Sequence, residues 1–308
     1  MNIKHLSIVA ALALLPTFLG AQTTREEFVN RYNMLSSKLG PAGVGIETLI
    51  EKWEAAYPDD IDMTTAKYAY YFYKSAKSTV VQLSQDRYLG REPILPYTDS
   101  LGVKRNWFED TVYDDSLFAI ANTAAEKAIA LHPERLDLRF MKLNGLMNYE
   151  KESPDMTLSE LGKLVDYHFS ARPKWIYNDV DVTDELFKGL MQEYCYSFFR
   201  IGSPSAAEAF KSFSEKMLQY YPSEALFMDN IGSYYLVFKG DTKSALKYYN
   251  RVLKKHPDDI TAIRNSILAA RKTKNIKLEK KYLPMLVKYG ETEADRNSAA
   301  IRLQALGG

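Results

Sequence analysis

A repeated proline is the feature that most limits how this chain can fold. Five prolines each close an amphipathic segment, and the residues twelve, eight and five positions before each proline are mostly apolar or small. Those three distances place the positions along one stripe of an α-helix. The spacing predicts stacked helices that each bury one stripe. The alternative is a set of unrelated amphipathic helices that each end at a proline. The prolines and their preceding residues are Pro58 (Ile46, Ile50, Trp53), Pro133 (Ala121, Ala125, Ala128), Pro173 (Leu161, Val165, His168), Pro222 (Phe210, Ser214, Met217) and Pro257 (Ala245, Tyr249, Val252).

The stretch 229–259 has the most complete form of this pattern. It resembles one unit of the tetratricopeptide repeat (TPR) family, in which two antiparallel helices, A and B, are joined by a turn and end at a proline. Ten residues separate Tyr235 from Ala245, one more than is usual in the family. We expect Gly232 to leave room where the two helices cross and Ala245 to let the crossing close. The residues that match the family pattern are Ile231, Gly232, Tyr235, Ala245, Tyr249 and Pro257.

One such unit cannot bury its apolar side alone, so neighbouring units must stack on it. We therefore expect residues 22–308 to form one all-α domain, and the resemblance implies a right-handed superhelical array. About six TPR-like antiparallel helix pairs and a C-terminal capping helix would fill that length. The expected helices are 24–38, 46–57, 62–83, 113–131, 134–150, 156–171, 183–200, 204–220, 225–238, 243–255, 259–273, 276–289 and 291–306.

Two insertions interrupt the expected array. Prolines and glycines in residues 84–112 forbid a continuous helix, and a small hairpin is expected around Asp99-Ser100-Leu101-Gly102. Residues 172–182 form a shorter loop that is rich in aromatic residues. A long ordered loop in a compact array is often functional, although it could also only cover the flank of the array.

Residues 1–21 have the pattern of a secretory signal peptide. Lys4 precedes an apolar run from Leu6 to Leu15, and small residues end the stretch at Ala21, where cleavage is expected. A retained membrane anchor is the alternative, but the run is shorter than the ~20 apolar residues that a span needs. Because no cysteine lies near the cleavage point, no lipid anchor is expected. The leader predicts an exported, periplasmic protein with no transmembrane segment after its removal.

The charges and cysteines of the chain exclude several classes of function. Lysine and arginine total 40 and aspartate and glutamate 39, so no overall charge favours nucleic acid or an anionic membrane. Cys195 is the only cysteine, which excludes an internal disulfide and a cysteine-rich zinc site. It stands on a mostly apolar predicted helix, which favours a buried structural thiol over a reactive one.

No metal or cofactor is expected from the remaining polar residues. No histidine has a second histidine or cysteine at ligand spacing. Asp179, Asp181 and Asp184 hint at calcium, but the mid-loop glycine and distal glutamate of a calcium loop are missing. A helix cap at Asp181 or Thr183 is the favoured interpretation.

A binding surface is better supported than a catalytic one. In TPR arrays the concave groove is lined mainly by the A helices, so the resemblance implies Asn230, Tyr234, Arg264 and Arg271 as groove residues. The two arginines are seven positions apart and share a helix face, where their guanidinium groups could bind a carboxylate or an acidic peptide. The alternative is that both arginines are solvated or paired with acidic residues of a neighbouring helix.

The expected function is a non-catalytic protein–protein interaction scaffold in the cell envelope that binds a peptide or protein in its groove. The mature chain resembles secreted TPR proteins of the Bacteroidetes type. A part in envelope assembly, as in the TPR lipoprotein of the outer-membrane barrel assembly machine, is a second interpretation that the missing lipidation cysteine weakens. The alternative from another class is a helical-array hydrolase acting on envelope glycans or peptides, which needs two carboxylates roughly 5–9.5 Å apart in the groove.

Overall fold

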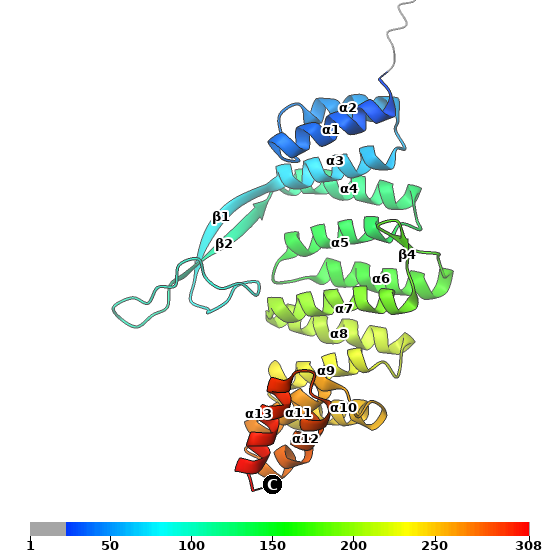
Figure 1. Ribbon diagram of the computed structural model, residues 1–308. Helices are drawn as coiled ribbons and strands as arrows, with labels where there is room; N and C mark the ends of the chain where they lie inside the picture. The colour runs from blue at the N-terminus through cyan, green and yellow to red at the C-terminus, as the bar shows by residue number, and fades with distance from the viewer. Residues whose placement is uncertain (1–22, 308) are drawn as a thin grey trace, which may run out of the picture.

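The computed structural model describes residues 23–307 as a long stack of helices (Figure 1). Within that range the elements are thirteen helices and four strands, and consecutive helices pack against one another along the stack. The prediction of an all-α array of helix pairs with a final added helix is confirmed. The helices are α1 (Arg25–Leu39), α2 (Ile46–Ala56), α3 (Ile61–Ser75), α4 (Asp115–Leu131), α5 (Leu136–Glu150), α6 (Asp155–Ala171), α7 (Asp184–Ile201), α8 (Pro204–Tyr220), α9 (Ala225–Val237), α10 (Thr242–Lys255), α11 (Ile260–Lys272), α12 (Ile276–Tyr289) and α13 (Glu293–Ala305).

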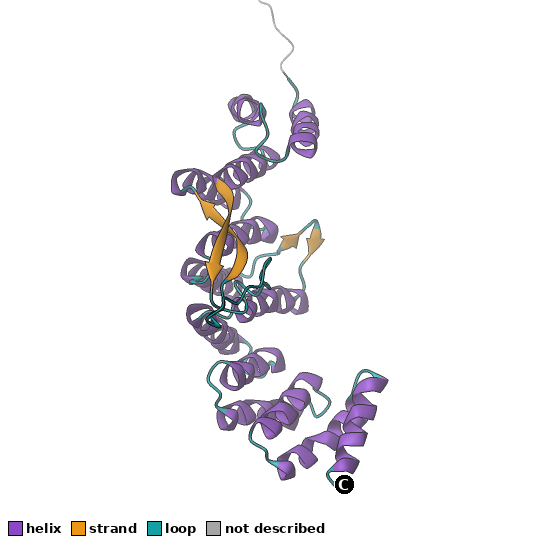
Figure 2. Ribbon diagram, turned by 90° about the vertical axis from the view of Figure 1, so that its left-hand side faces the viewer, coloured by secondary structure: helices purple, strands orange, loops and turns teal. Residues whose placement is uncertain are grey.

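Helices α1, α3, α5, α7, α9 and α11 are the A helices of the six pairs, and we call the side of the stack that they form the A-helix side. Seen from its edge, the stack is bowed (Figure 2). None of the helices that the structure describes is both long and apolar enough to cross a membrane. The predicted leader, residues 1–21, lies outside the described residues.

The proline register locates the buried stripe of the B helices. Of the residues twelve, eight and five positions before the five prolines, all are buried except His168, which is partly buried. His168 stacks on Phe187 with ring centroids 3.8 Å apart and accepts a 3.0 Å hydrogen bond from the Trp175 indole nitrogen. The sequence prediction of one apolar stripe per B helix is therefore confirmed.

The unit formed by α9 and α10 closes as tightly as its sequence predicts. A Cβ atom added at Gly232 would lie 2.5 Å from Cε1 of Tyr249, and Ala245 has no exposed surface. Tyr249 is fully buried between the two helices. The small residues at these two positions are thus required by the helix crossing.

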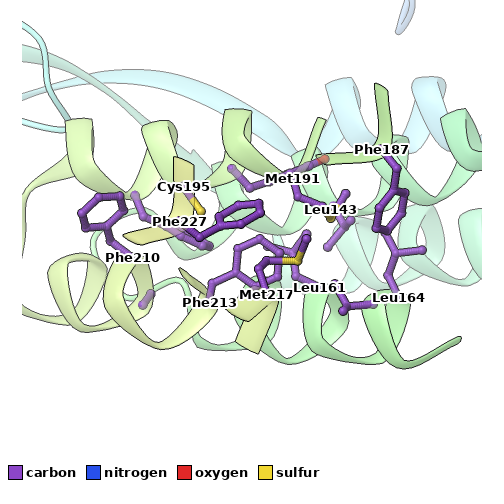
Figure 3. Packing of buried hydrophobic residues seen from close by; sticks show 14 of the residues in the cluster. Leu143, Leu161, Leu164, Phe187, Met191, Cys195, Phe210, Phe213, Met217 and Phe227 are labelled. Carbon is purple, nitrogen blue, oxygen red and sulfur yellow. The ribbon is translucent and has the colours of Figure 1, made fainter. Parts of the chain in front are cut away.

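The largest apolar cluster runs through α5 to α9, and Figure 3 shows part of it. Cys195 lies in this cluster near Met191 and Phe227, with its sulfur 3.6 Å from the Ser214 hydroxyl. Burial raises the pKa of the Cys195 thiol to about 12, which keeps it protonated at neutral pH. The predicted buried thiol is confirmed.

The prediction of a helix from 62 to 83 is wrong in its second half. Helix α3 ends at Ser75, and the chain continues as strand β1 (Ala76–Leu83), which pairs antiparallel with β2 (Asn106–Tyr113). Residues 78–81 contain three β-branched side chains, which favour an extended strand when a partner strand is available. We call residues 76–113 the arm, because the pair of strands projects from the stack (Figure 1).

The far end of the arm contains the predicted small hairpin. The Asp99 carboxylate accepts hydrogen bonds from the backbone of Leu101 (3.0 Å) and Val103 (2.9 Å), and Arg105 holds the same carboxylate at 2.8 Å. Gly102 has a φ of 78°, which the turn requires. Large apolar side chains are exposed along this end: Ile94, Leu95, Tyr97, Leu101, Val103 and Trp107.

The second insertion forms a short hairpin on the A-helix side. Strands β3 (Ile176–Tyr177) and β4 (Val180–Asp181) are joined by Asn178 and Asp179, whose φ angles of 48° and 63° match a two-residue hairpin turn. The hairpin lies on the inner side of the bowed stack (Figure 2). The Thr183 hydroxyl accepts a hydrogen bond from the backbone of Leu186, so Thr183 is the predicted cap of α7.

Candidate functional site

An open hollow of about 150 Å³ lies on the A-helix side between α5, α7 and the β3–β4 hairpin. Its walls come from two neighbouring helix pairs and from the insertion between them, so side chains from distant parts of the sequence converge there. This space is smaller than the ~300–1,000 Å³ of small-molecule sites, so it suits a single side chain. The lining residues are Phe140, Asn144, Tyr177, Leu190, Glu193, Tyr194 and Ser197.

Three aromatic rings form the floor and one wall of the hollow. The Phe140 ring lies 5.5 Å from the ring of Tyr177 and 5.5 Å from that of Tyr194, measured between centroids. Phe140 and Tyr194 are each only 6% exposed, so they form the floor, whereas Tyr177 is more exposed and stands at the side. Edge-to-face and tilted rings at these distances stabilise one another and fix the shape of the hollow.

The hairpin that carries Tyr177 is held in place by backbone contacts. The backbone N–H of Ile176 donates a 3.0 Å hydrogen bond to the carbonyl of Glu134, next to the start of α5. Trp175, only 2% exposed, anchors the hairpin in the apolar cluster. Tyr177 is therefore presented to the hollow by a fixed element.

The polar groups of the hollow divide into a paired set and a free carboxylate. The Tyr194 hydroxyl donates a 3.1 Å hydrogen bond to the Asn144 side-chain oxygen. Burial raises the pKa of Tyr194 well above its ordinary value, so this hydroxyl stays neutral. The Glu193 side chain is exposed, and none of the ion pairs among residues 23–307 involves it.

Two of the predicted groove residues are buried between helices. Asn230 is 7% exposed and exchanges two amide hydrogen bonds with Gln192, of 3.0 Å and 2.7 Å. Tyr234 is 3% exposed, and its hydroxyl donates to the carboxylate of Glu208 on α8. Neither side chain can meet a partner without breaking these contacts, so their role in partner binding stays a prediction.

The two predicted arginines are paired with acidic residues of neighbouring helices. Arg264 lies 2.7 Å from Asp295, and Arg271 lies 2.7 Å from Glu279. Both arginine side chains keep about half of their surface exposed, 43% and 50%. The alternative that the sequence left open, pairing with a neighbouring helix, thus matches the geometry, and a contribution to partner binding stays a prediction.

None of these four residues lines the hollow between α5 and α7. The sequence pointed toward the hollow only through the aromatic loop 172–182, which supplies Tyr177. Phe140 and Tyr194 could not be told from ordinary core residues, because they stand at apolar helix positions. In the sequence, Glu193 has no feature that distinguishes it from other exposed helix residues. Its position at the hollow depends on how α5, α7 and the hairpin pack together.

A second hollow, of about 100 Å³, lies between the arm and the C-terminal ends of α5 and α7. Its buried carboxylate, Asp110, is paired with Lys151 at 2.8 Å. A Cβ atom added at Gly90 would come within 2.6 Å of the Arg200 carbonyl oxygen, so the arm touches the end of α7 directly. The residues around this hollow therefore form the contact that attaches the arm to the stack.

A carboxyl pair also lies near the A-helix side, at Asp229 and Asp259. Asp229 is 4% exposed, and burial together with the neighbouring Asp259 raises its pKa to about 9. Asp259 accepts a 2.9 Å hydrogen bond from the backbone of Ala262 as the cap of α11. Because a substrate cannot reach a buried Asp229, this pair does not meet the requirement of the hydrolase alternative.

No group of three or more histidine, cysteine or acidic side chains that could hold a metal ion occurs within residues 23–307. The aspartates at 179, 181 and 184 that hinted at calcium have other surroundings. Asp179 lies 3.7 Å from Arg135, and Asp184 accepts a hydrogen bond from the Tyr221 hydroxyl.

No protein-family model and no curated protein matches the sequence. Among solved structures, the crystal structure of YrrB, described as a TPR protein with an unusual peptide-binding site, is similar to this chain over 79% of its length and 92% of YrrB. The identity is 15% and the TM-score 0.35. A likeness this distant says nothing about the function of the chain. The TPR-like array is instead seen directly in the stacked helix pairs and in the crossing of α9 and α10.

Proposed function

We propose that this protein is a non-catalytic interaction scaffold that binds an extended peptide or protein partner on its A-helix side. One observation carries the proposal: two A helices and a hairpin anchored by Trp175 converge on an aromatic hollow with few polar groups. Sites with this composition bind by burying an apolar group and orienting it with a few polar contacts. The stacked helices extend the same side in both directions, which suits an extended partner.

We also propose that the scaffold works in the cell envelope, like the secreted TPR proteins of the Bacteroidetes type that its sequence resembles. The leader pattern in residues 1–21 supports export to the periplasm. We expect the mature protein to begin at Gln22, which mass spectrometry of the protein from periplasmic extract would show. An intact Met1 on protein recovered from the membrane fraction would contradict this prediction.

The test of the binding proposal is capture of partners from envelope extract by the immobilised mature protein. Tyr177→Ala removes one wall of the hollow, and Tyr196→Ala is the matched control, because Tyr196 is an exposed tyrosine of α7 that does not line the hollow. We expect Tyr177→Ala to lose captured partners that Tyr196→Ala retains, with capture carried out well below the melting temperature of both variants. Equal capture by both variants would show that binding occurs elsewhere.

A further inference from the structure

We propose that the hollow between α5 and α7 receives a basic side chain, lysine or arginine, of the bound partner. This inference rests on the proposed function and names the chemistry of the group that the hollow recognises. It departs from the acidic peptide that Arg264 and Arg271 suggested, because both arginines already have acidic partners.

The first argument is the free carboxylate at the hollow. Glu193 is the only charged residue among those that line it. Its side chain is exposed, and the ion pairs of residues 23–307 leave it without a basic partner. The apolar walls keep part of the water away from an ion pair formed at Glu193, and the exposure of its side chain leaves the attraction sensitive to salt.

The second argument is the sign of the charge around the hollow. Residues 179–193 contain five acidic side chains and one basic side chain, Lys188. Lys188 is itself occupied, with its nitrogen 2.9 Å from Glu224. Asp179 in turn lies 3.7 Å from Arg135, and Asp184 lies 3.9 Å from Lys188. Glu193 is thus the carboxylate that lines the hollow without an ion-pair partner among residues 23–307, and it favours a cation over the carboxylate of an acidic peptide. The acidic residues are Asp179, Asp181, Asp184, Glu185 and Glu193.

The third argument is the shape and chemistry of the walls. Lysine and arginine carry long apolar stems that pack on apolar surface while the charged head stays polar. Leu190 and the rings of Phe140 and Tyr177 offer such a surface beside Glu193. Aromatic rings also attract a cation placed near their faces. The Tyr194 hydroxyl already donates to Asn144, so it is not available to hold a carboxylate.

The experiment uses three fluorescein-labelled, acetylated nonapeptides in which every third residue is lysine, acetyl-lysine or glutamate. Acetyl-lysine keeps the stem of lysine and removes its charge. Binding to the full mature protein is followed by fluorescence anisotropy. We expect the lysine peptide to bind more tightly than both others, and added salt to weaken it.

Glu193→Gln is the test variant, and Glu185→Gln is the matched control, an exposed carboxylate of the same helix outside the hollow. Because hydrogen bonds to charged groups are the stronger ones, we expect Glu193→Gln to weaken the lysine peptide at least about tenfold. Glu185→Gln should change binding less than threefold, since an exposed charge outside the hollow contributes only weakly. Melting temperatures of both variants should equal that of the unchanged protein, because both side chains are exposed.

Equal loss in both variants, or tighter binding of the glutamate peptide, would overturn the inference. Failure of this inference is distinguishable from failure of the proposed function. If Glu193→Gln still captures envelope partners that Tyr177→Ala loses, the hollow binds a partner but not through a basic side chain. If Tyr177→Ala captures those partners as well, the proposed function itself fails.

Discussion

At the scale of single residues, the array depends on a few positions where helices approach too closely for a larger side chain. Gly232 is such a position, because an added Cβ would lie within 3 Å of three atoms of the Tyr249 ring. Gly162, in the middle of α6, has no neighbour within 4 Å of an added Cβ. Replacing each of the two glycines by alanine therefore separates the cost of a steric clash from the effect of alanine on the helix backbone.

We expect Gly232→Ala to lower the free energy of unfolding by about 1–3 kcal/mol, because the buried Tyr249 ring must move. Gly162→Ala should be neutral or stabilise by up to about 1 kcal/mol, since alanine favours the helix more than glycine. Urea unfolding followed by circular dichroism measures both. Equal effects at the two positions would mean that α9 and α10 do not cross at Gly232.

Asp229 gives a prediction about pH. Its pKa is raised to about 9 by burial and by the neighbouring Asp259, so the folded state holds a proton that the unfolded chain releases near its ordinary value. The contribution of protonated Asp229 to the stability of the folded protein is therefore complete below pH 4 and is lost as pH rises toward 9. We expect Asp229→Asn to melt at a higher temperature than the unchanged protein at pH 8. The difference should shrink toward pH 4, and a difference independent of pH would show that Asp229 is not protonated when folded.

At the scale of elements, ion pairs tie the last helices together. Glu279 on α12 is 2% exposed and contacts both Arg271 on α11 and Arg302 on α13, at 2.7 Å and 2.9 Å. Arg264 on α11 also reaches Asp295 on α13. Of the two predicted groove arginines, Arg264 thus holds the capping helix directly and Arg271 holds Glu279 on α12, whatever else they bind.

We expect Glu279→Gln to lower the free energy of unfolding by about 1.5–3 kcal/mol, because the buried carboxylate accepts charge-assisted hydrogen bonds. Glu291→Gln is the control, since Glu291 is exposed and lies 3.4 Å from Arg264; a change below about 1 kcal/mol is expected there. Hydrogen bonds from Arg302 and Arg271 lower the pKa of Glu279 to about 2.

The contribution of Glu279 is therefore complete above its ordinary pKa of 4.5 and lost as pH falls toward 2. Thermal unfolding of both variants between pH 2 and pH 7 checks this. If the Glu279→Gln difference does not shrink at acid pH, the carboxylate is not what α13 requires. Arg264→Ala with Arg271→Ala should likewise lower the melting temperature, and a loss of partner capture without that change would restore their predicted role in the groove.

At the scale of the whole molecule, the arm is an addition to a stack that is complete without it. Helices α3 and α4 pack directly on one another, and the arm leaves and re-enters the stack at the neighbouring residues Ala76 and Tyr113. Its one ionic contact with the stack among the described residues joins Asp110 to Lys151.

We expect replacement of residues 77–112 by Asn-Gly to leave the helical signal of the array and its cooperative unfolding intact. The two-residue turn fits between antiparallel strand ends such as Ala76 and Tyr113. Stability should fall by about 1–3 kcal/mol, because Lys151 loses its partner. Circular dichroism and urea unfolding measure both effects, and loss of cooperative unfolding would show that the arm holds α5 and α7 in place.

The stacked helices and their buried stripes follow from the amino-acid sequence alone. The spacing before each proline is a local property of the chain, and it predicts which residues of a helix face the core whatever the neighbours are. The tight crossing at Gly232 and Ala245, the small hairpin around Gly102 and the burial of Cys195 followed from the same kind of evidence.

Features that depend on contacts between distant segments of the chain became visible in the three-dimensional structure. Residues 76–83 form a strand because residues 106–113 pair with them, and the local sequence does not predict which segment will be the partner strand. Asn230 and Tyr234 became buried because Gln192 and Glu208 meet them from other helices. The hollow exists because α5, α7 and a hairpin converge, and the chemistry of Glu193 follows from what surrounds it.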